Sequence, residues 1–193
     1  MMRKTATQRN SKGTAIAESP FVLLVLFIFL AFPMINLGAI GYRSYFLIAS
    51  CKEAAHKASK SLTYQTKVPD VQLGNNNPAV EVAQETIRRY LNSFNGVKVN
   101  EIKTGIVVVE NATGKKSGPF YTPISGADVY GNVYYLEVEL DAEAVPMITY
   151  GGGLLGNIPG ITSPVRIKTH AREVFENPKG LTASANSLQL AMN

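Results

Sequence analysis

The sequence predicts an α+β fold in which a long N-terminal helix packs on a small, mostly antiparallel sheet. Residues 21–40 are an uncharged run of membrane length, and residues 42–62 carry an apolar stripe with helical spacing. Several later segments have the β-branched or alternating pattern of strands. The first two observations together indicate one helix with a transmembrane half and an amphipathic half.

The uncharged run has 20 residues, FVLLVLFIFLAFPMINLGAI, and begins at Phe21. An α-helix rises about 1.5 Å per residue, so the run covers roughly 30 Å, the hydrocarbon thickness of a bilayer. Pro33 and Asn36 weaken the helix and predict a kink rather than an end, because transmembrane helices tolerate proline. The alternative is a secretory signal peptide with its apolar core at 21–32 and cleavage near Gly41.

Positive charge is concentrated ahead of this run. The chain has 193 residues and a net charge of +5, and four of its 19 basic residues lie in the first 13 residues, which contain no acid. Because the remainder is nearly neutral, the charge gives no support for a nucleic-acid partner. The positive-inside rule instead predicts a cytoplasmic N-terminus and a C-terminal domain on the other side of the membrane.

Residues 42–62, YRSYFLIASCKEAAHKASKSL, continue the helix. Their apolar side chains recur at spacings of three and four, at Tyr42, Tyr45, Phe46, Ala49, Cys51, Ala54, Ala55, Ala58 and Leu62. An unbroken helix over 14–63 would be about 75 Å long. Cys51 is the only cysteine, so no intramolecular disulfide can form. Its alanine-rich surroundings predict a buried apolar role, with an intermolecular bridge as the alternative.

The remaining residues are predicted to form the exported α+β domain. One amphipathic helix is expected over 78–94, with a face made of Val80, Ala83, Ile87, Tyr90, Leu91 and Phe94. Strands are expected at 97–99, 105–110, 132–140 and 165–175, and the segment 111–132 is dense in turn residues. The uncharged loop 145–161 either folds over its own core or forms a contact patch for a partner or the membrane surface.

Motifs of catalysis and of ligand binding fail on their spacing. TGKKSG at 113–118 is not a phosphate loop, because Val109 stands where that motif requires glycine. His56 and His170 have no cysteine or carboxylate nearby at metal-ligand spacing, and His56 suits a solvated helix face. We therefore predict no catalytic, metal-binding or cofactor-binding residues and a non-enzymatic protein, with an exported enzyme as the least favoured hypothesis.

A short motif precedes the membrane-length run. The basic leader ends in Gly13, Glu18 is the fifth residue after it, and a hydrophobic helix follows, as in KGTAIAE. This arrangement resembles the class III signal of type IV pilins and pseudopilins, whose fold is a pilin-like α+β layout. The resemblance implies that a prepilin peptidase cuts between Gly13 and Thr14. Ser19 departs from the family, because Flp-type pilins usually carry an aromatic residue at that position.

A second segment, 133–176, is similar to the C-terminal half of TadE-like pseudopilins. A strand leads into a Pro- and Gly-rich apolar loop, and a final strand ends near a basic–acidic pair, here Arg172 and Glu173. The resemblance implies a TadE-like minor pseudopilin, a structural subunit of a Tad/Flp-type pilus or related secretion filament. Its implied partners are a prepilin peptidase, other pilins or pseudopilins and the inner-membrane pilus assembly platform, with no nucleic acid and no cofactor.

The resemblance divides the chain into a leader (1–13), a long helix (14–64) and an exported domain (65–193). The protein would be a single-pass protein of the cytoplasmic membrane, with incorporation into an extracellular pilus. The alternative function is an uncleaved, single-pass anchor that displays a binding domain outside the cytoplasmic membrane.

The resemblance implies a role for Glu18 in subunit docking, and physical chemistry supplies a reason for it. An unpaired charge in lipid costs about 2.5–3.5 kcal/mol on insertion scales. Cleavage would give Thr14 a free α-amine with an ordinary pKa near 8, mostly protonated at neutral pH. In a stack of subunits, Glu18 of one chain can meet the Thr14 amine of its neighbour. The alternative is a Glu18 that only interacts with the dipole at its own helix N-terminus, worth about 0.3–1 kcal/mol.

Overall fold

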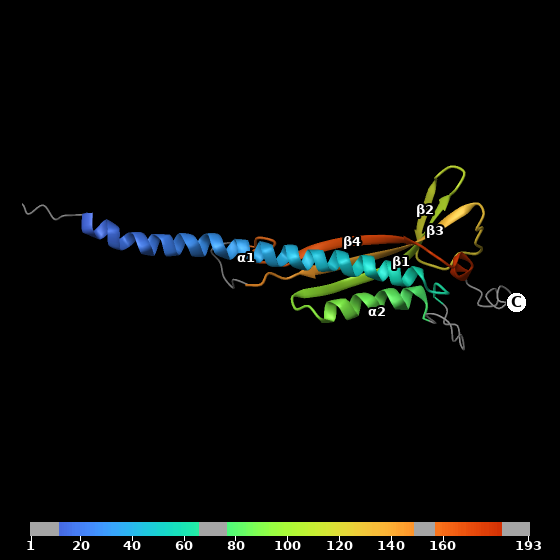
Figure 1. Cartoon of the computed structure of the whole chain (residues 1–193), viewed down its shortest axis with the longest axis horizontal. Coiled ribbons are helices and arrows are strands. Elements are labelled where there is room, and N and C mark those ends of the chain that lie inside the picture. Colours follow the sequence, from blue (N-terminus) through green and yellow to red (C-terminus); the bar gives the residue numbers. More distant parts are fainter. Residues whose placement is uncertain (1–11, 66–76, 149–156, 183–193) are drawn as a thin grey trace, which may run out of the picture.

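The computed structural model describes residues 12–65, 77–148 and 157–182, with side chains from Ser19 onward. It has the α+β, pilin-like layout that the sequence predicts, with one long helix on a four-stranded antiparallel sheet (Figure 1). The elements are α1 (Lys12–Ser59), α2 (Ala79–Asn92), β1 (Val97–Glu110), β2 (Lys116–Phe120), β3 (Asn132–Ala144), β4 (Val165–Val174) and a short 3₁₀ helix, η1 (Pro178–Leu181).

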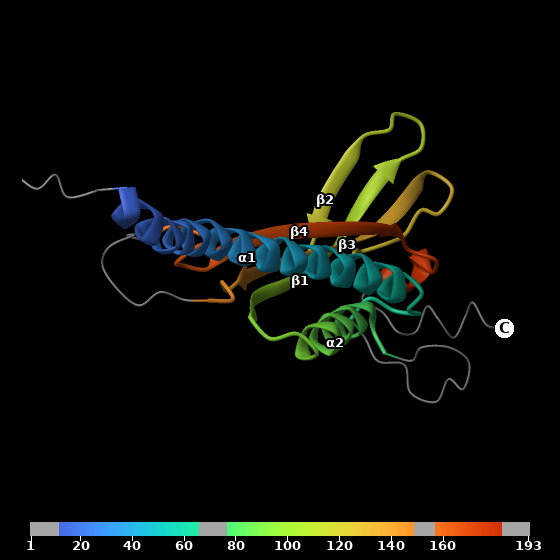
Figure 2. The same ribbon diagram turned by 60° about the vertical axis from the view of Figure 1, so that its left-hand side comes forward.

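Helix α1 has 48 residues, about 72 Å of helix, and runs through Pro20 and Pro33 without interruption. Its N-terminal half projects beyond the domain and its C-terminal half lies along the sheet (Figures 1 and 2). The predicted helix therefore exists with nearly its predicted length. It ends before Lys60 and Ser61, whose N–H groups bond to carbonyls three residues back and tighten the last turn.

The buried stripe of α1 differs from the predicted one at its start. In the C-terminal half of α1 the fully buried side chains are Leu47, Ser50, Cys51, Ala54, Ala55 and Ala58. Tyr42 and Tyr45, at the start of the predicted stripe, are 57% and 67% exposed. Aromatic packing on the domain begins here, because the Phe46 ring lies 3.9 Å and the Tyr42 ring 6.3 Å from the ring of Phe94 at the centroids.

Small residues bring α1 close to the sheet. The Cys51 thiol is fully buried and donates a hydrogen bond to the Val138 carbonyl at 3.2 Å. A bulkier side chain at this point would force the helix away from β3, since packed interiors leave no room for added volume. The predicted buried role of Cys51 is confirmed. Its burial contradicts the alternative of an intermolecular disulfide, because no second thiol can reach it.

The sheet has the order β2-β1-β3-β4, with every neighbouring pair antiparallel. The expected strands at 97–99 and 105–110 are one strand, because a register shift between Val99 and Glu101 lets β1 continue along β3. Within the turn-dense segment 111–132 lies a strand that was not predicted, β2, which pairs with β1 despite Gly118 and Pro119. Strand β3 also continues four residues beyond the expected end.

Helix α2 lies beside α1 and against β1 (Figure 2). Ala83, Ile87 and Leu91 are buried, as predicted. Val82 is also buried, although the predicted apolar face contained Val80 instead. The first turn of α2 is held by the chain just after α1. Its first two N–H groups bond to the carbonyls of residues 63 and 64, at 2.9 and 3.2 Å.

A second contact lies just beyond the C-terminal end of α1. The carbonyl of Gly180 in η1 accepts a hydrogen bond from the Tyr64 N–H at 3.0 Å, and the buried Tyr64 hydroxyl donates to the Thr104 carbonyl at 2.6 Å. Burial raises the pKa of Tyr64 to about 12. The hydroxyl therefore stays protonated and donating at neutral pH. The end of α1, strand β1 and the C-terminal turn are tied at this one point.

Candidate membrane and subunit interface

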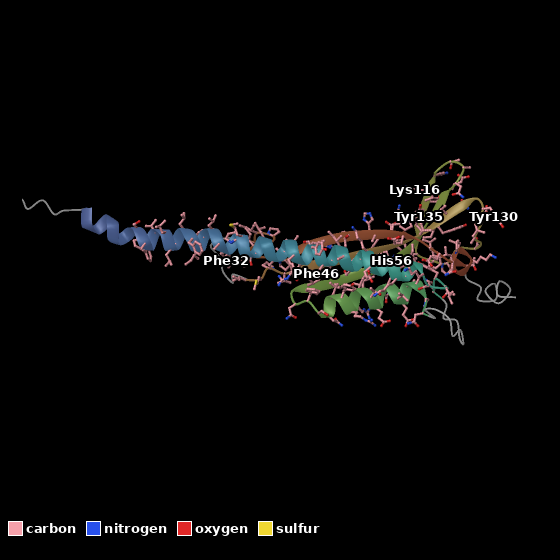
Figure 3. All side chains as sticks on the ribbon, viewed as in Figure 1. Phe32, Phe46, His56, Lys116, Tyr130 and Tyr135 are labelled. Atoms are coloured by element: carbon pink, nitrogen blue, oxygen red, sulfur yellow. The ribbon has the colours of Figure 1, made fainter. Side chains whose placement is uncertain are left out.

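The N-terminal half of α1 is apolar on every side. Except for the half-buried Phe32, the large apolar side chains over residues 21–37 are between 40% and 69% exposed, and they project from all around the helix (Figure 3). The most apolar 18-residue window has a mean hydropathy of 2.5, and only 6% of it is buried within the protein. By length and composition this helix is suited to cross a membrane.

The predicted cleavage and docking residues lie at the start of this helix. Gly13, Thr14 and Glu18 belong to its first turns, and their side chains fall outside what the structure describes. Thr14 and Glu18 are four residues apart, so the helical backbone places them on one face. The helix joins them without a break to the exposed apolar stretch. Cleavage after Gly13 and docking through Glu18 remain predictions.

Asn36 is a completely buried polar residue within the apolar stretch. Its side-chain amide donates to the carbonyls of Ile148 and Ile161 at 3.0 and 2.9 Å, and its oxygen accepts the Ile148 N–H at 3.0 Å. Both amide hydrogens and the oxygen are therefore used. Asn36 joins the helix to both sides of the loop between β3 and β4, from more than 100 residues away in sequence.

Two further contacts place the ends of this loop along α1. The Arg43 guanidinium donates to the Val145 carbonyl at the start of the loop. Near its end, Gly160 packs so closely on the helix that a Cβ there would lie 3.2 Å from the Ile40 side chain. The described ends of the loop thus lie along α1 at Arg43 and Ile40, before the part of the helix that packs on the sheet. Residues 149–156 of the predicted contact patch lie outside the described residues.

Asn36 was predicted only to weaken the helix, and its contact with the loop was not predicted. The sequence did contain an indication of this contact. An amide in an otherwise apolar, membrane-length run is expensive in lipid unless it has partners, so it indicates a contact with another segment. The sequence could not show which segment this is, because the hydrogen bonds join positions more than 100 residues apart.

The outer face of the sheet is charged. Acidic residues of β3 lie directly opposite basic residues of β4: Glu137 faces Arg172, Glu139 faces His170, Asp141 faces Lys168 and Glu143 faces Arg166. Arg172 lies 2.7 Å from Glu137 across the strands. The adjacent residues Arg172 and Glu173 point to opposite faces of the sheet, because side chains alternate along a strand.

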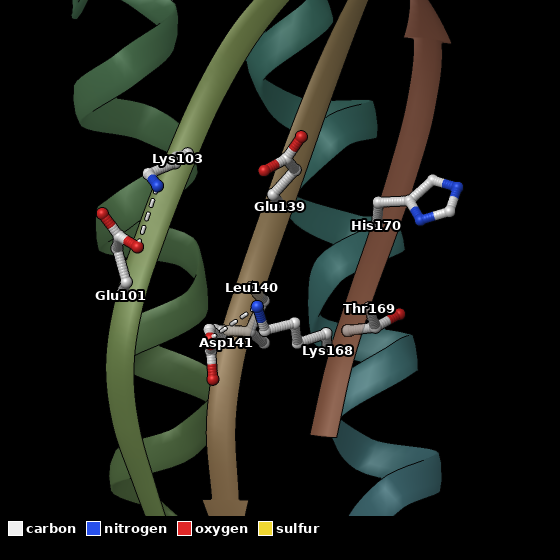
Figure 4. A pocket seen from close by; sticks show the side chains of 8 residues that line it. All are labelled: Glu101, Lys103, Glu139, Leu140, Asp141, Lys168, Thr169 and His170. Carbon is white, nitrogen blue, oxygen red and sulfur yellow. Dashed lines mark ion pairs between the residues drawn. The ribbon is translucent and has the colours of Figure 1, made fainter. Parts of the chain in front are cut away.

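A shallow depression of about 240 Å³ lies on this face, between Glu101 and Lys103 of β1 and Lys168 and His170 of β4 (Figure 4). Two of its acids have cationic partners, with Lys103 at 3.0 Å from Glu101 and Lys168 at 3.7 Å from Asp141, and Glu139 accepts a hydrogen bond from the Tyr121 hydroxyl at 3.0 Å. Hydrogen bonds from Arg166 lower the pKa of Asp141 to about 2, so this carboxylate stays ionised at neutral pH.

This depression has the chemistry of a solvated sheet face. An ion-paired carboxylate with a lowered pKa, such as Asp141, is a poor proton donor or acceptor near neutrality. Among the described residues, no group of three or more histidine, cysteine or acidic side chains is arranged to hold a metal ion. His56 is exposed on α1 (Figure 3), as predicted for a solvated helix face. The apolar half of α1 and its bound loop therefore form the better candidate interface.

Comparison with protein-family models, with curated proteins and with solved structures finds no match to this chain. The function of this protein is therefore inferred from its residues and their geometry.

Proposed function

We propose that this protein is a TadE-like minor pseudopilin, a structural subunit for assembly of a Tad/Flp-type pilus or a related secretion filament. One observation carries the proposal: a single helix is bare and apolar over its N-terminal half and packed on an α+β domain over its C-terminal half. A subunit that is first a membrane protein and then a filament protein needs both halves, because the bare half must face lipid before assembly and other helices afterwards.

The leader supports the proposed orientation and processing. Its four basic residues favour a cytoplasmic N-terminus in the inner membrane, with the domain on the outer side. A prepilin peptidase would then cut between Gly13 and Thr14. In the signal-peptide alternative, cleavage near Gly41 would remove Asn36, which is hydrogen-bonded to the loop of the domain. The contacts of Asn36 therefore favour a helix that is retained.

Glu18 would dock one subunit onto the next. Residues 14 and 18 fall on one face of the helical backbone, and neutralising the new amine and the carboxylate in a filament would avoid the cost of a lone charge in an apolar environment. Other pilins or pseudopilins would supply the neighbouring helices. The inner-membrane assembly platform would supply the site at which the subunits join.

The test is mass spectrometry of the N-terminus of the full chain, expressed with a prepilin peptidase and isolated from the membrane fraction. The proposal expects a mature chain that begins at Thr14. A Gly13→Leu variant should keep its leader, while a Glu18→Ala variant should be cut but fail to enter filaments. An intact leader in the natural chain, or a new N-terminus near Gly41, would sink the proposal. Normal filament entry of Glu18→Ala would reduce that residue to a helix-terminal charge.

A second candidate is the uncleaved anchor with an exported binding domain. The observation that favours it lies at the end of the domain farthest from the membrane helix, where Tyr130 is 93% exposed (Figure 3). Phe120 and Tyr121 of the neighbouring hairpin are 42% and 44% exposed. Aromatic side chains in such a position suit protein recognition. An intact leader in the experiment above would select this function.

A further inference from the structure

We propose that the loop between β3 and β4 is a second membrane contact of this protein. Its two described ends, residues 145–148 and 157–162, would insert into the outer leaflet beside α1. The occupant of their exposed apolar surface is lipid. This inference rests on the membrane span in the proposed function, and it adds a contact that the span alone does not require.

The first argument is geometric. Asn36 lies four residues before the end of the apolar run, about 6 Å inside it along the helix axis. If residues 21–40 fill a hydrocarbon core of about 30 Å, everything bonded to Asn36 lies within that core. A span that began at Phe21 and ended before Asn36 would have 15 residues and cover only about 22 Å. A span of full thickness from Phe21 therefore takes the loop into the membrane with the helix.

The second argument is composition and exposure. No charged residue occurs between Glu143 and Arg166. Met147, Ile148 and Ile158 are 67%, 40% and 41% exposed. Together they form an apolar surface at the depth of Asn36, continuous with the bare helix. Lipid is the environment already required at that depth, so the same bilayer would cover both.

Third, backbone polar groups at both described ends of the loop have hydrogen-bond partners within the protein. Non-helical chain is tolerated at membrane depth only where its polar groups have partners. Asn36 serves both sides of the loop. Within the second end, the Ile158 N–H bonds to Thr162 Oγ1 at 2.7 Å, and the Gly160 N–H bonds to the Ser163 carbonyl at 2.8 Å. In an ordinary surface loop, water would form hydrogen bonds with these groups instead.

The residues just above the loop suit the membrane surface. Tyr42 and Tyr45 are exposed about half a turn and about one and a half turns beyond Ile40, and exposed tyrosines are typical of the interface between lipid and water. Arg43 is the first charged residue after the apolar run, and its guanidinium turns to the Val145 carbonyl where the loop begins. The charge thus marks the upper limit of the inserted region. Two insertions would fix the tilt and rotation of the domain on the bilayer.

The chain contains no tryptophan, so a single introduced tryptophan reports on one position. The test places Met147→Trp in the full chain and reconstitutes it in vesicles of phosphatidylcholine with or without brominated acyl chains. Tyr130→Trp, at the far end of the domain, is the aqueous control, and Leu26→Trp on the bare helix is the lipid reference. Ile158→Trp repeats the test from the other end of the loop if Met147→Trp folds poorly. Iodide reports access from water.

The inference expects loop fluorescence to lose intensity with brominated lipid, by more than half of the loss seen at Leu26→Trp, and to resist iodide. Quenching by iodide with none by brominated lipid would place the loop in water and overturn the inference while the span survives. Protection from both quenchers would mean that protein, such as a second copy, covers the loop, and would also overturn it. An unquenched Leu26→Trp would remove the span itself, and both proposals with it.

Discussion

Asn36 shows how one side chain can decide where a whole segment lies. It is the buried amide of an apolar helix, and each of its polar groups is matched by the backbone of one distant loop. A hydrogen bond between neutral groups contributes about 0.5–1.5 kcal/mol net, but leaving a buried partner unsatisfied costs about 1–3 kcal/mol. In lipid, where no water can replace the lost partner, the contact between the helix and the loop depends on this residue.

Replacing Asn36 by leucine should therefore release the loop. Three backbone groups lose their partner, so opening of residues 145–148 and 157–162 should become at least about tenfold more frequent, equivalent to about 1.4 kcal/mol. Amide hydrogen exchange of the full chain in detergent measures this opening. Met34→Leu is the matched control, because Met34 is 65% exposed on the same helix. Unchanged loop exchange in Asn36→Leu would show that other contacts hold the loop.

At the scale of elements, the sheet separates two kinds of chemistry. Its inner face gives buried Leu136, Val138 and Leu140 to the core under α1, while its outer face alternates acids of β3 with bases of β4. Opposite charges in directly facing positions favour one pairing of the strands. A shift by one residue would turn the whole row to the wrong face. The charged rows thus protect the register of β4, which lies at the edge of the sheet.

The pair of Asp141 and Arg166 gives this role a pH dependence. The guanidinium holds the Asp141 pKa at about 2, below the ordinary value near 3.9, so the folded state favours the ionised carboxylate. Its stabilisation is complete above about pH 4–5 and is lost as the pH falls toward 2. Asp141→Asn should lower the free energy of unfolding at neutral pH, and the deficit should shrink over that range. Urea denaturation followed by circular dichroism measures it.

Arg166→Gln provides the matched background for that experiment. If the effect belongs to the pair, Asp141→Asn should cost much less stability when Arg166 is already absent. An equal cost in both backgrounds would assign the effect to Lys168, the second cation near this carboxylate, at 3.7 Å.

At the scale of the whole molecule, one contact joins segments from both ends of the domain. Gly180 lies against the backbone just after α1, where its carbonyl receives the Tyr64 N–H. A Cβ at position 180 would lie 1.8 Å from the Leu62 carbonyl oxygen, and backbone cannot move aside as a flexible side chain can. The bare half of α1 projects from the opposite end (Figure 1), so the membrane half and this junction can be tested separately.

Gly180→Ala should destabilise the whole domain. Overpacking of this kind costs about 1–3 kcal/mol, and here two backbone segments must separate. Thermal or urea unfolding of the full chain in detergent measures the loss. Gly126→Ala is the matched control, because no heavy atom lies within 4 Å of the added Cβ, and it should stay within about 0.5 kcal/mol of the natural protein. Equal stability of the two variants would mean that the turn can shift without cost.

The parts of the fold that depend on local pattern were predictable. The uncharged run, the helical spacing after it and the alternation over 132–140 each correspond to an observed element. Strand β2 was not predictable in this way, because Gly118 and Pro119 disfavour a strand and only pairing with β1 offsets that preference. The same reason explains the continuous β1, since the bulge that joins its two halves exists only against β3.

The sequence by itself determined the α+β class and the membrane-length helix, because charge and periodicity act over short distances along the chain. The cleavage and docking residues are predictions from its resemblance to the signal of type IV pilins. Only the tertiary structure decided which residues of α1 meet the domain, how the charges of β3 are paired and that Asn36 holds a loop against the apolar helix. Those outcomes depend on contacts between positions far apart in sequence. A single side chain meets such partners only after the chain has folded.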